Sequence, residues 1–304
     1  MADETTTTTV TIDGHTLKLS NLAKVLYPEA GFTKGEVIDY YTRIAPVMLD
    51  HVGDRGITMR RFPNGVDAGS FWEKRCPSHR PGFVGTALGP GDRSGDIGYC
   101  VLGNRAAMVW AANMAALEIH SPMARAGNIE EPTMVVFDLD PGPGTDVADC
   151  AEIAIWIGEV LDGVGLRAWP KTSGSKGLQL YVPVNRPGLA HEAASAFARA
   201  VAQAMERHHG DRVTSVMTKR VRQDKVFIDW SQNSRHKTTI APYSLRARPR
   251  PTVSTPVTWD EVEAAADGAP LSFDAADVIE RVERHGDLFA DVATVEQKLP
   301  EPDL

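Results

Sequence analysis

The middle of the chain alternates short apolar segments with longer segments of helical periodicity. The segment TMVVFDLD, which follows Pro132, is an apolar run that ends in two aspartates and predicts a buried strand. Four more strands are predicted by LRAWPKTS, LQLYVPV, KVFIDW and TTIAPYSL, and two helices by DVADCAEIAIWIGEVLDGVG and HEAASAFARAVAQAMERHH. This β-α-β-β-α-β-like order predicts an α+β fold, with a central mixed or antiparallel sheet and helices on one side.

Regular patterns also mark both ends of the chain. TVTIDGHTLKLS predicts a hairpin that turns at its Asp-Gly pair. TKGEVIDYYTRIAPVMLDHV predicts a helix capped by Thr33, and RAAMVWAANMAALEIH predicts a second, mostly buried helix that ends at His120. Near the C-terminus, Thr258 and Glu261 fit a capping box, and a further helix is predicted over roughly 274–285.

The length and composition predict a folded domain with a substantial core. The chain has 304 residues, of which 42% are hydrophobic and 24% charged. No apolar run approaches the length of a membrane span, so no membrane partner is expected. We expect a single domain over 1–304 in three parts. These are a smaller N-terminal α/β module over about 1–131, a catalytic sheet module with an RRM-like order over about 132–250, and an acidic helical segment over about 251–304.

Three cysteines bear on the cellular compartment. Cys76, Cys100 and Cys150 are widely separated, so neither a zinc finger nor a CxxC redox motif is predicted. An odd number of cysteines fits a reducing cytoplasm, and we therefore expect a cytoplasmic protein.

The charges are unevenly distributed along the chain. The net charge is −8, which argues mildly against a nucleic-acid partner. Residues 211–250, however, hold ten Lys or Arg and three Asp, a net charge of +7, whereas residues 251–304 have a net charge of −10. A basic block followed by an acidic segment indicates a phosphate-binding surface, because the local field matters more than the total. Two ordinary solvated surfaces are the alternative.

Candidate chemistry begins with the aspartates of the first central strand. Side chains alternate along a strand, so Asp138 and Asp140 share one face and repel each other unless a cation lies nearby. Oxygen-only ligands suit Mg²⁺ or Mn²⁺. Asp229 ends another predicted strand, and three carboxylates can hold two ions about 4 Å apart. The alternatives are a solvent-exposed strand end whose aspartates cap a turn and, for Asp229, a surface position beside a core tryptophan.

A glycine-containing turn lies between these strands. In KTSGSKGLQLY the glycines allow close approach of a ligand, and Ser173, Ser175 and Lys176 supply hydrogen-bond donors, which predicts a phosphate cradle. The turn is not a Walker A loop, because G-x(4)-G-K-[ST] is absent and both flanks are predicted strands. A flexible hairpin tip is the alternative. For His120, a structural hydrogen-bonding role is the alternative to a catalytic one.

Taken in order, several segments resemble the polymerase domain of bacterial ligase D, a branch of the archaeo-eukaryotic primase superfamily. The resemblance covers roughly residues 18–250. The matching segments are LAKVLYPEAGFTKGEVIDYY, RRFPNGV, FWEK, LEIH, VVFDLDPG, TSGSKGLQLY, TKRVRQDKVFIDWSQN and KTTIAPYSLRAR.

The resemblance implies a template-dependent nucleotidyltransferase that extends a primer 3′-hydroxyl at DNA gaps or ends during end joining, with a preference for ribonucleotides and two Mn²⁺ or Mg²⁺ ions per site. It implies as partners gapped or end DNA with a 5′-phosphate, NTP or dNTP, a Ku-like protein and a DNA ligase, with a nucleoid-associated location. By position, the implied residues are Asp138, Asp140 and Asp229 for metal and catalysis; Arg60, His120, Ser173, Ser175, Lys176, Arg222, Gln232 and Arg246 for the nucleotide; Asn21, Lys24 and Lys34 for the DNA 5′-phosphate; and Phe71 and Trp72 for base stacking.

Two segments depart from the family pattern. Where the family often has Arg-Lys-Arg before a Trp-Pro-Asn-Gly turn, this chain has Met59-Arg60-Arg61 followed by Phe62. A nucleotide contact made by the family's lysine would have to come from Arg60. The segment from Cys76 to Cys100 matches poorly, so the template preference is expected to differ.

Other classes of protein share parts of the pattern. A phosphatase of the haloacid dehalogenase class would use Asp138 as nucleophile and Asp140 as acid or base, and GDLFAD at 286–291 imitates its later motif. That motif should follow an apolar strand, whereas here it follows a predicted helix. A non-catalytic DNA-end binding module would need the basic residues but not the three aspartates. A DxD glycosyltransferase is a further alternative.

Overall fold

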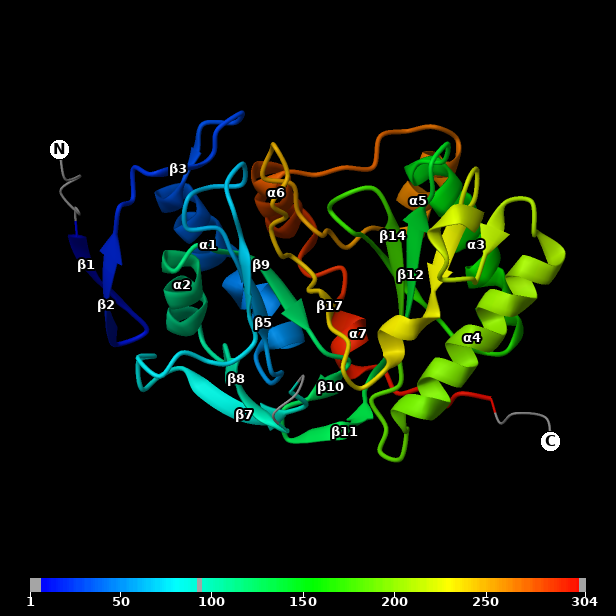
Figure 1. The fold of residues 1–304 in the computed structure, drawn as a ribbon, viewed down its shortest axis with the longest axis horizontal. Helices are drawn as coiled ribbons and strands as arrows, with labels where there is room; N and C mark the ends of the chain where they lie inside the picture. The colour runs from blue at the N-terminus through cyan, green and yellow to red at the C-terminus, as the bar shows by residue number, and fades with distance from the viewer. Residues whose placement is uncertain (1–6, 92–94, 301–304) are drawn as a thin grey trace. The chain divides into compact units, whose positions relative to one another are not determined.

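The computed structural model describes residues 7–91 and 95–300, which divide into two compact units (Figure 1). The chain enters each unit more than once, and the segment after Pro251, which the sequence grouped into one acidic part, is shared between them. Unit 1 comprises 1–121, 240–253 and 273–286, and unit 2 comprises 122–239, 254–272 and 287–304.

Unit 1 is built around a four-stranded sheet of order β17-β9-β5-β6 and the long helix α1. Its elements are β1 (Thr7–Ile12), β2 (His15–Ser20), β3 (Val25–Tyr27), β4 (Phe32–Thr33), α1 (Lys34–Val52), β5 (Thr58–Arg61), β6 (Phe71–Glu73), β7 (Gly85–Gly89), β8 (Ile97–Val101), α2 (Arg105–Asn113), β9 (Ala116–Ser121), β17 (Thr239–Ile240) and α6 (Ala275–His285).

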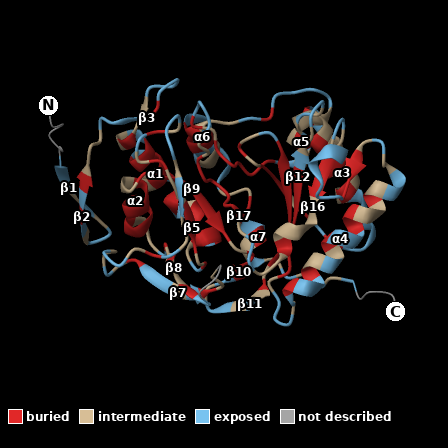
Figure 2. Ribbon diagram, in the orientation of Figure 1, coloured by how far each residue is buried: buried red, intermediate tan, exposed pale blue. Residues whose placement is uncertain are grey.

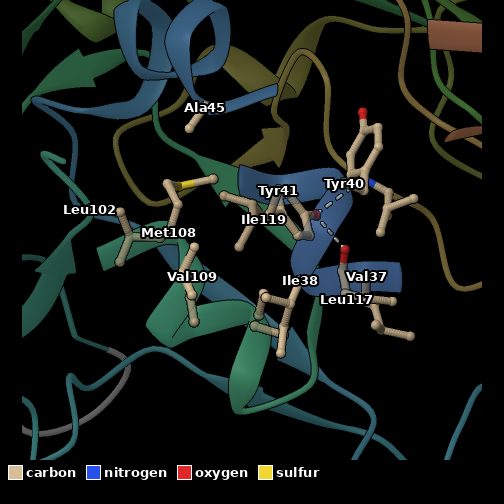
Figure 3. Packing of buried hydrophobic residues seen from close by; sticks show 14 of the residues in the cluster. Val37, Ile38, Tyr40, Tyr41, Ala45, Leu102, Met108, Val109, Leu117 and Ile119 are labelled. Carbon is tan, nitrogen blue, oxygen red and sulfur yellow. Dashed lines mark hydrogen bonds between the residues drawn. The ribbon is translucent and has the colours of Figure 1, made fainter. Parts of the chain in front are cut away.

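The core of unit 1 packs α1 and α2 against strand β9. Figure 3 shows Tyr41 of α1, Met108 and Val109 of α2 and Ile119 of β9 converging in one apolar cluster. The Tyr41 hydroxyl is fully buried and donates a 2.7 Å hydrogen bond to the Leu117 carbonyl, so the polar end of the ring is satisfied. This packing fixes β9, which carries candidate site residues.

The predicted N-terminal elements are confirmed. The hairpin pairs β1 with β2 and turns at Asp13 and Gly14, both of which have positive φ as a two-residue turn requires. Helix α1 begins after Thr33, whose hydroxyl accepts from the Glu36 amide while the Glu36 carboxylate accepts from the Thr33 amide.

The prediction of one helix ending at His120 is wrong. Helix α2 stops at Asn113, Ala115 adopts a left-handed conformation with φ of 56°, and Ala116–Ser121 form strand β9. Every residue of β9 is buried, although only Ala116, Leu117 and Ile119 are apolar. The predicted helix was extended from the apolar α2 across the turn at Ala115 into this short strand, because periodicity does not separate a short buried strand from a helix. His120 therefore lies within a strand.

Unit 2 contains a five-stranded sheet of order β13-β14-β12-β16-β15. The order β12-α3-β13-β14-α4-β16 confirms the predicted β-α-β-β-α-β succession, although TTIAPYSL contributes only the two-residue β17 to the other sheet. The elements are β10 (Ala124–Arg125), β11 (Asn128–Pro132), β12 (Met134–Pro141), α3 (Val147–Gly163), β13 (Trp169–Thr172), β14 (Leu178–Pro183), α4 (His191–His208), β15 (Val213–Thr214), η1 (Lys219–Val221), β16 (Val226–Asp229), η2 (Trp230–Asn233), α5 (Trp259–Ala266) and α7 (Ala290–Thr294).

Helices α3 and α4 cover one face of this sheet. Phe137 of β12 packs against Phe197 of α4, and the Cys150 thiol of α3 approaches the Leu139 carbonyl. Figure 2 shows the buried strip of α4 beside its exposed strip. Because side chains alternate along β12, Asp138 and Asp140 project from the face opposite to that of Phe137 and Leu139.

The helices near the C-terminus are confirmed, and one cysteine pair was not foreseen. Helices α5 and α6 begin after Thr258 and Asp274, each with a complete capping box. Cys76 and Cys100 form a disulfide bond, which the sequence-based expectation of reduced cysteines did not include. Within residues 7–91 and 95–300, no helix is long and apolar enough to cross a membrane.

Candidate functional site: two clusters of charged residues

The three candidate metal-binding aspartates converge on one face of the unit 2 sheet. Antiparallel pairing of β12 with β16 places Asp138 directly opposite Asp229 and Asp140 opposite Phe227. Residues directly opposite each other in an antiparallel pair share a face, and Asp140 is two residues from Asp138. All three carboxylates therefore project from the same face, as the sequence predicted.

Amide side chains hold two of these carboxylates in place. Gln179 Nε2 donates to Asp138 Oδ1 at 2.9 Å, and Ser231 donates to Asp229 Oδ1 through its amide and its hydroxyl. Gln232 Nε2 contacts Asp138 Oδ2 at 3.4 Å and Asp229 Oδ2 at 3.1 Å. One amide group thus lies between the two carboxylates.

Asn233 locks this arrangement to the sheet. Its side-chain oxygen accepts from the Val136 amide at 2.7 Å, and its side-chain nitrogen donates to the Val136 carbonyl at 2.8 Å. Asn233 is fully buried. Its side chain makes the two backbone hydrogen bonds with Val136 that a neighbouring strand would otherwise make, beyond the point where β16 pairs with β12. The helix η2, with Gln232, is thereby fixed beside Asp138.

The positive charge near the acidic cluster does not offset the repulsion among its carboxylates. Burial raises the pKa of Asp138 to about 7, and the charges of Asp140 and Asp229 act in the same direction. The Gln179 hydrogen bond and the charge of Lys171 oppose this rise without cancelling it. At neutral pH the ionised form of Asp138 is therefore unfavourable, and a proton or a metal cation would relieve the repulsion.

The donor set fits a divalent cation in kind, because it consists of carboxylate oxygens. Among the residues that the structure describes, no group of three or more His, Cys, Asp or Glu side chains is placed closely enough to hold a metal ion. Gln232 explains part of this result, because its amide contacts both Asp138 and Asp229. An ion shared by these two carboxylates would have to displace that amide.

Two glycine-dependent contacts surround the end of β12. A Cβ atom on Gly142 would lie 1.8 Å from the Arg222 carbonyl oxygen, so only glycine allows the segment 222–225 to approach the Pro-Gly-Pro-Gly break. A Cβ atom on Gly177 would lie 2.0 Å from the Leu139 carbonyl oxygen. The glycines thus bring Arg222 and the turn 173–177 against the strand end that carries Asp138 and Asp140.

The predicted phosphate cradle forms a compact turn between β13 and β14. Ser173 Oγ accepts hydrogen bonds from the amides of Ser175 at 3.2 Å and Gly177 at 3.1 Å, and the Lys176 side chain is exposed. Arg222 stacks on Phe227 at 3.6 Å, and its Nε atom is buried without a hydrogen-bond partner. Both segments therefore lie beside the strand end that carries Asp138 and Asp140.

A second cluster of charged residues lies on the unit 1 sheet. Cross-strand pairing aligns Trp72 of β6, Arg60 of β5 and Glu118 of β9 in one row. Glu118 Oε2 lies 3.5 Å from Arg60 Nη1 and 3.1 Å from His120 Nε2, and Glu118 Oε1 accepts from Arg246 Nε at 3.2 Å. The predicted nucleotide-binding residues of unit 1 thus share a single buried carboxylate.

Two exposed aromatic rings lie on strand β6. Trp72 adjoins this cluster, whereas Phe71 pairs with Arg61 and projects from the other face of the strand. Trp72 and Phe71 are 52% and 45% exposed, which is unusual for large aromatic side chains. Trp72 packs its edge against His120 at a ring separation of 4.8 Å, and the Arg60 guanidinium lies 5.4 Å from the Trp72 ring. The structure therefore places both predicted stacking residues on strand β6 with accessible faces.

The ionisation states of the unit 1 cluster follow from its contacts. Burial would raise the pKa of Glu118, but the His120 hydrogen bond and the charge of Arg246 prevail and lower this pKa to about 2. Burial lowers the pKa of His120, and Glu118 only partly opposes the change. At neutral pH Glu118 is ionised and His120 is neutral, with its Nε2–H donating to the carboxylate.

The predicted 5′-phosphate residues also lie together in unit 1. The Lys24 amide donates to the Asn21 carbonyl at 3.0 Å, and the Lys34 amide donates to the Lys24 carbonyl at 2.8 Å. Lys34 Nζ donates to the Ser20 carbonyl, whereas the Lys24 side chain is exposed and contacts Asn64. Burial lowers the pKa of Lys34 to about 8, and the charges of Lys24 and Arg61 add to this effect.

Sequence reasoning missed Glu118, Gln179 and Asn233. Glu118 precedes His120 by two residues and shares its strand face, but the segment was interpreted as a helix. Gln179 lies on β14, directly after the predicted cradle, and pairs with Asp138 of β12. Strand alternation could have identified these two residues, whereas the contact of Asn233 with Val136 depends on the course of η2.

The phosphatase alternative does not fit the observed elements. The segment from Gly286 to Asp291 follows helix α6 and ends inside α7, which begins at Ala290, so it is not carried by a strand.

Replacing Glu118 with Gln should destabilise the protein by about 2–4 kcal/mol, because Arg60 and Arg246 would lose their shared buried carboxylate. The carboxylate contributes stability above pH 4.5, and this contribution is lost as pH falls toward the folded-state pKa of about 2. Urea unfolding at pH 7 would measure the change. Glu283→Gln, which breaks the exposed pair with Arg43, serves as control and should cost about 1 kcal/mol or less. Equal effects of both variants would contradict the prediction.

Replacing Asp138 with Asn should stabilise the metal-free protein above neutral pH. The folded state raises the pKa from 3.8 to about 7, so the contribution of Asp138 is present below pH 3.8 and is lost as pH rises through 7. The gain should reach at most about 4 kcal/mol at pH 8, since one pKa unit is worth about 1.4 kcal/mol. Melting temperatures with a chelator at pH 5 and pH 8 provide the test, with the exposed Asp162→Asn as control. A variant no more stable than wild type at pH 8 would refute it.

A protein-family model and proteins of known name match this chain over most of its length. The family model described as LigD, primase-polymerase domain, matches residues 33–289. The multifunctional non-homologous end joining protein LigD of Mycolicibacterium smegmatis is 44% identical over 278 residues, which are 90% of this chain and 36% of that protein. The bifunctional LigD of Bacillus subtilis is 29% identical over 275 residues, which are 90% of this chain and 44% of that protein.

A solved structure is also closely similar. The polymerase domain from Mycobacterium tuberculosis ligase D, in complex with DNA, superposes with a TM-score of 0.87 and 42% sequence identity, covering 92% of this chain and 99% of that one. The chain spans less than half the length of the LigD relatives named above. A family match across most of the chain, together with this likeness in sequence and structure, shows that the chain belongs to the LigD primase-polymerase domain family.

Proposed function

We propose that this chain catalyses template-dependent nucleotidyl transfer to a primer 3′-hydroxyl at DNA gaps or ends, in end-joining repair. The observation that carries the proposal is the convergence of Asp138, Asp140 and Asp229 on one sheet face, in a chain of the LigD primase-polymerase family. The DNA complex of the similar polymerase domain supports DNA as substrate. The preference for ribonucleotides rests on the family alone.

Asp138, Asp140 and Asp229 are proposed to bind two divalent cations, Mn²⁺ or Mg²⁺. Bound cations would lower the pKa of the primer hydroxyl and neutralise charge on the phosphates. The protein orients the carboxylates through Gln179 and Ser231, and a bound cation would relieve the repulsion from Asp140 and Asp229 that helps to raise the pKa of Asp138. Gln232 would leave its bridging position and become free to contact the nucleotide.

The nucleotide is proposed to be bound by the residues that the family resemblance implies. In unit 2, Ser173, Ser175 and Lys176 present donors from a turn, and Arg222 presents an Nε–H without a partner. In unit 1, the guanidinium groups of Arg60 and Arg246 share one carboxylate, so the cluster retains positive charge for an anion. His120 is neutral there and is proposed to bind the nucleotide by hydrogen bonding rather than by charge.

DNA is proposed to be bound at two further places in unit 1. The exposed rings of Phe71 and Trp72 suit stacking on a base, worth roughly 1–3 kcal/mol per base and independent of sequence. Asn21, Lys24 and Lys34 are proposed to bind a downstream 5′-phosphate. Lys34 supports this role, because a phosphate would favour the charged form that burial disfavours.

The cellular setting is proposed from the relatives, which are named as non-homologous end joining proteins. A Ku-like protein and a DNA ligase are the proposed partners, and the nucleoid of the bacterial cytoplasm is the proposed location.

Both Asp138→Ala and Asp140→Ala should reduce primer extension on a gapped duplex by about a thousandfold or more, because charge stabilisation is usually the largest catalytic contribution. DNA binding should remain within about threefold of wild type, since neither change removes a cation. Extension should be measured with ribonucleotides and with deoxyribonucleotides, each in the presence of Mn²⁺ or Mg²⁺. The exposed Asp162→Ala is the control, and substantial synthesis by either test variant would exclude the proposed chemistry.

Lys24→Ala should weaken the preference for a gap that carries a 5′-phosphate by about tenfold, since an exposed charge-assisted contact is lost. Binding of otherwise identical phosphorylated and unphosphorylated duplexes measures the preference. Lys18→Ala, on the exposed side of β2, removes the same charge elsewhere and should leave the ratio unchanged. An unaltered ratio in Lys24→Ala would rule out this role.

A further inference from the structure

A continuous row of side chains leads away from the acidic cluster into the interior of unit 2. Lys171 of β13 pairs with Gln179 of β14, Gln179 pairs with Asp138 of β12, and Asp138 pairs with Asp229 of β16. Partners directly opposite each other share a face of the sheet, so the four side chains form a row across four strands. Lys171 and Gln179 are buried, with relative exposures of 0% and 2%.

Gln179 is oriented by its contact with Asp138. Its Nε2 atom donates to Asp138 Oδ1 at 2.9 Å and to Thr239 Oγ1 at 2.7 Å, so both amide hydrogens are used. Its Oε1 atom is buried and accepts no hydrogen bond. A buried amide oxygen without a donor costs about 1–3 kcal/mol. The amide is therefore held in the orientation that serves the carboxylate rather than in one that would satisfy both its ends.

Lys171 places a buried ammonium group at the far end of the row. Its Nζ donates to Ser254 Oγ at 2.6 Å, and Ser254 Oγ donates to the Thr172 carbonyl at 2.9 Å. The ammonium group also lies 5.4 Å from the Tyr181 ring centre. A fully buried lysine is costly unless its charge is used, and the carboxylates of Asp138 and Asp229 lie along the same row.

We propose that Gln179 is a positioning residue for metal binding by Asp138. Gln179 binds Oδ1 and thereby directs Oδ2 toward Asp229. This inference rests on the proposed function, because it requires that Asp138 binds a cation. Outer contacts of this kind set the orientation and basicity of a metal ligand, and their loss typically weakens metal affinity 10- to 100-fold.

A purely structural role makes a different prediction. If Gln179 only fills the interior, its replacement by Met, which is similar in length, should change stability and leave metal affinity unaffected in the folded fraction. Metal affinity in the absence of DNA and nucleotide therefore separates the two roles without reference to polymerase activity.

The experiment is a titration of the whole chain with Mn²⁺ alone, in which electron paramagnetic resonance measures free ion. The variants are Gln179→Met, Gln179→Ala and Gln179→His, and Gln203→Met on helix α4 is the matched control. Gln179→Met should weaken Mn²⁺ binding 10- to 100-fold. Gln179→His should retain more affinity than Gln179→Met because an imidazole N–H can replace the donor.

Each result decides between the proposals. Wild-type affinity in Gln179→Met, with binding lost in Asp138→Asn, would overturn this inference and leave the proposed function standing. Unchanged Mn²⁺ binding in Asp138→Asn, or no binding by wild type, would overturn the proposed metal site and this inference with it. If Gln179→Met does not fold, Gln179→Ala decides: weakened binding supports the inference, and wild-type binding rejects it.

Discussion

The repulsion among Asp138, Asp140 and Asp229 is the constraint on which the candidate site depends. Antiparallel pairing of β12 with β16 leaves these side chains no choice of face, so the backbone enforces a proximity that the charges oppose. The energetic result is the pKa of Asp138, which burial and its two neighbours raise to about 7. The unrelieved repulsion therefore lowers folding stability as pH rises to neutral and above.

Polar side chains rather than apolar packing maintain this geometry. The side chain of Asn233 takes the place of a neighbouring strand in bonding the backbone of Val136 in β12. Gln179 and Gln232 each donate to Asp138. Such buried amides have few alternative partners, so each one limits the rotamers of the next. Glycines at 142 and 177 contribute by having no side chain, since any Cβ there would meet a backbone oxygen. The site is thus as much a product of the hydrogen-bond network as of the sheet.

Much of this architecture was predictable from local patterns. The hairpin at Asp13, the capping boxes at Thr33 and Thr258, and the shared face of Asp138 and Asp140 all follow from rules that act over a few residues. Strand β9 was not predicted, because only two residues separate it from the apolar helix α2 and the helical pattern was extended across the turn at Ala115. That error concealed the contact of Glu118 with His120 on one strand face. The disulfide between Cys76 and Cys100 and the contact of Asn233 with Val136 depend on chain paths that no local signal encodes.

The two clusters have opposite charge imbalances within their own units: negative charge is in excess in unit 2 and positive charge in unit 1. In unit 2, three carboxylates face too little positive charge, and the pKa of Asp138 rises. In unit 1, Glu118 is buried among Arg60, Arg246 and His120, and its pKa falls to about 2. With His120 neutral, the unit 1 cluster carries two guanidinium charges against one carboxylate. Glu118 therefore holds both arginines in fixed positions while leaving a net positive charge, which is the condition that an incoming anion requires.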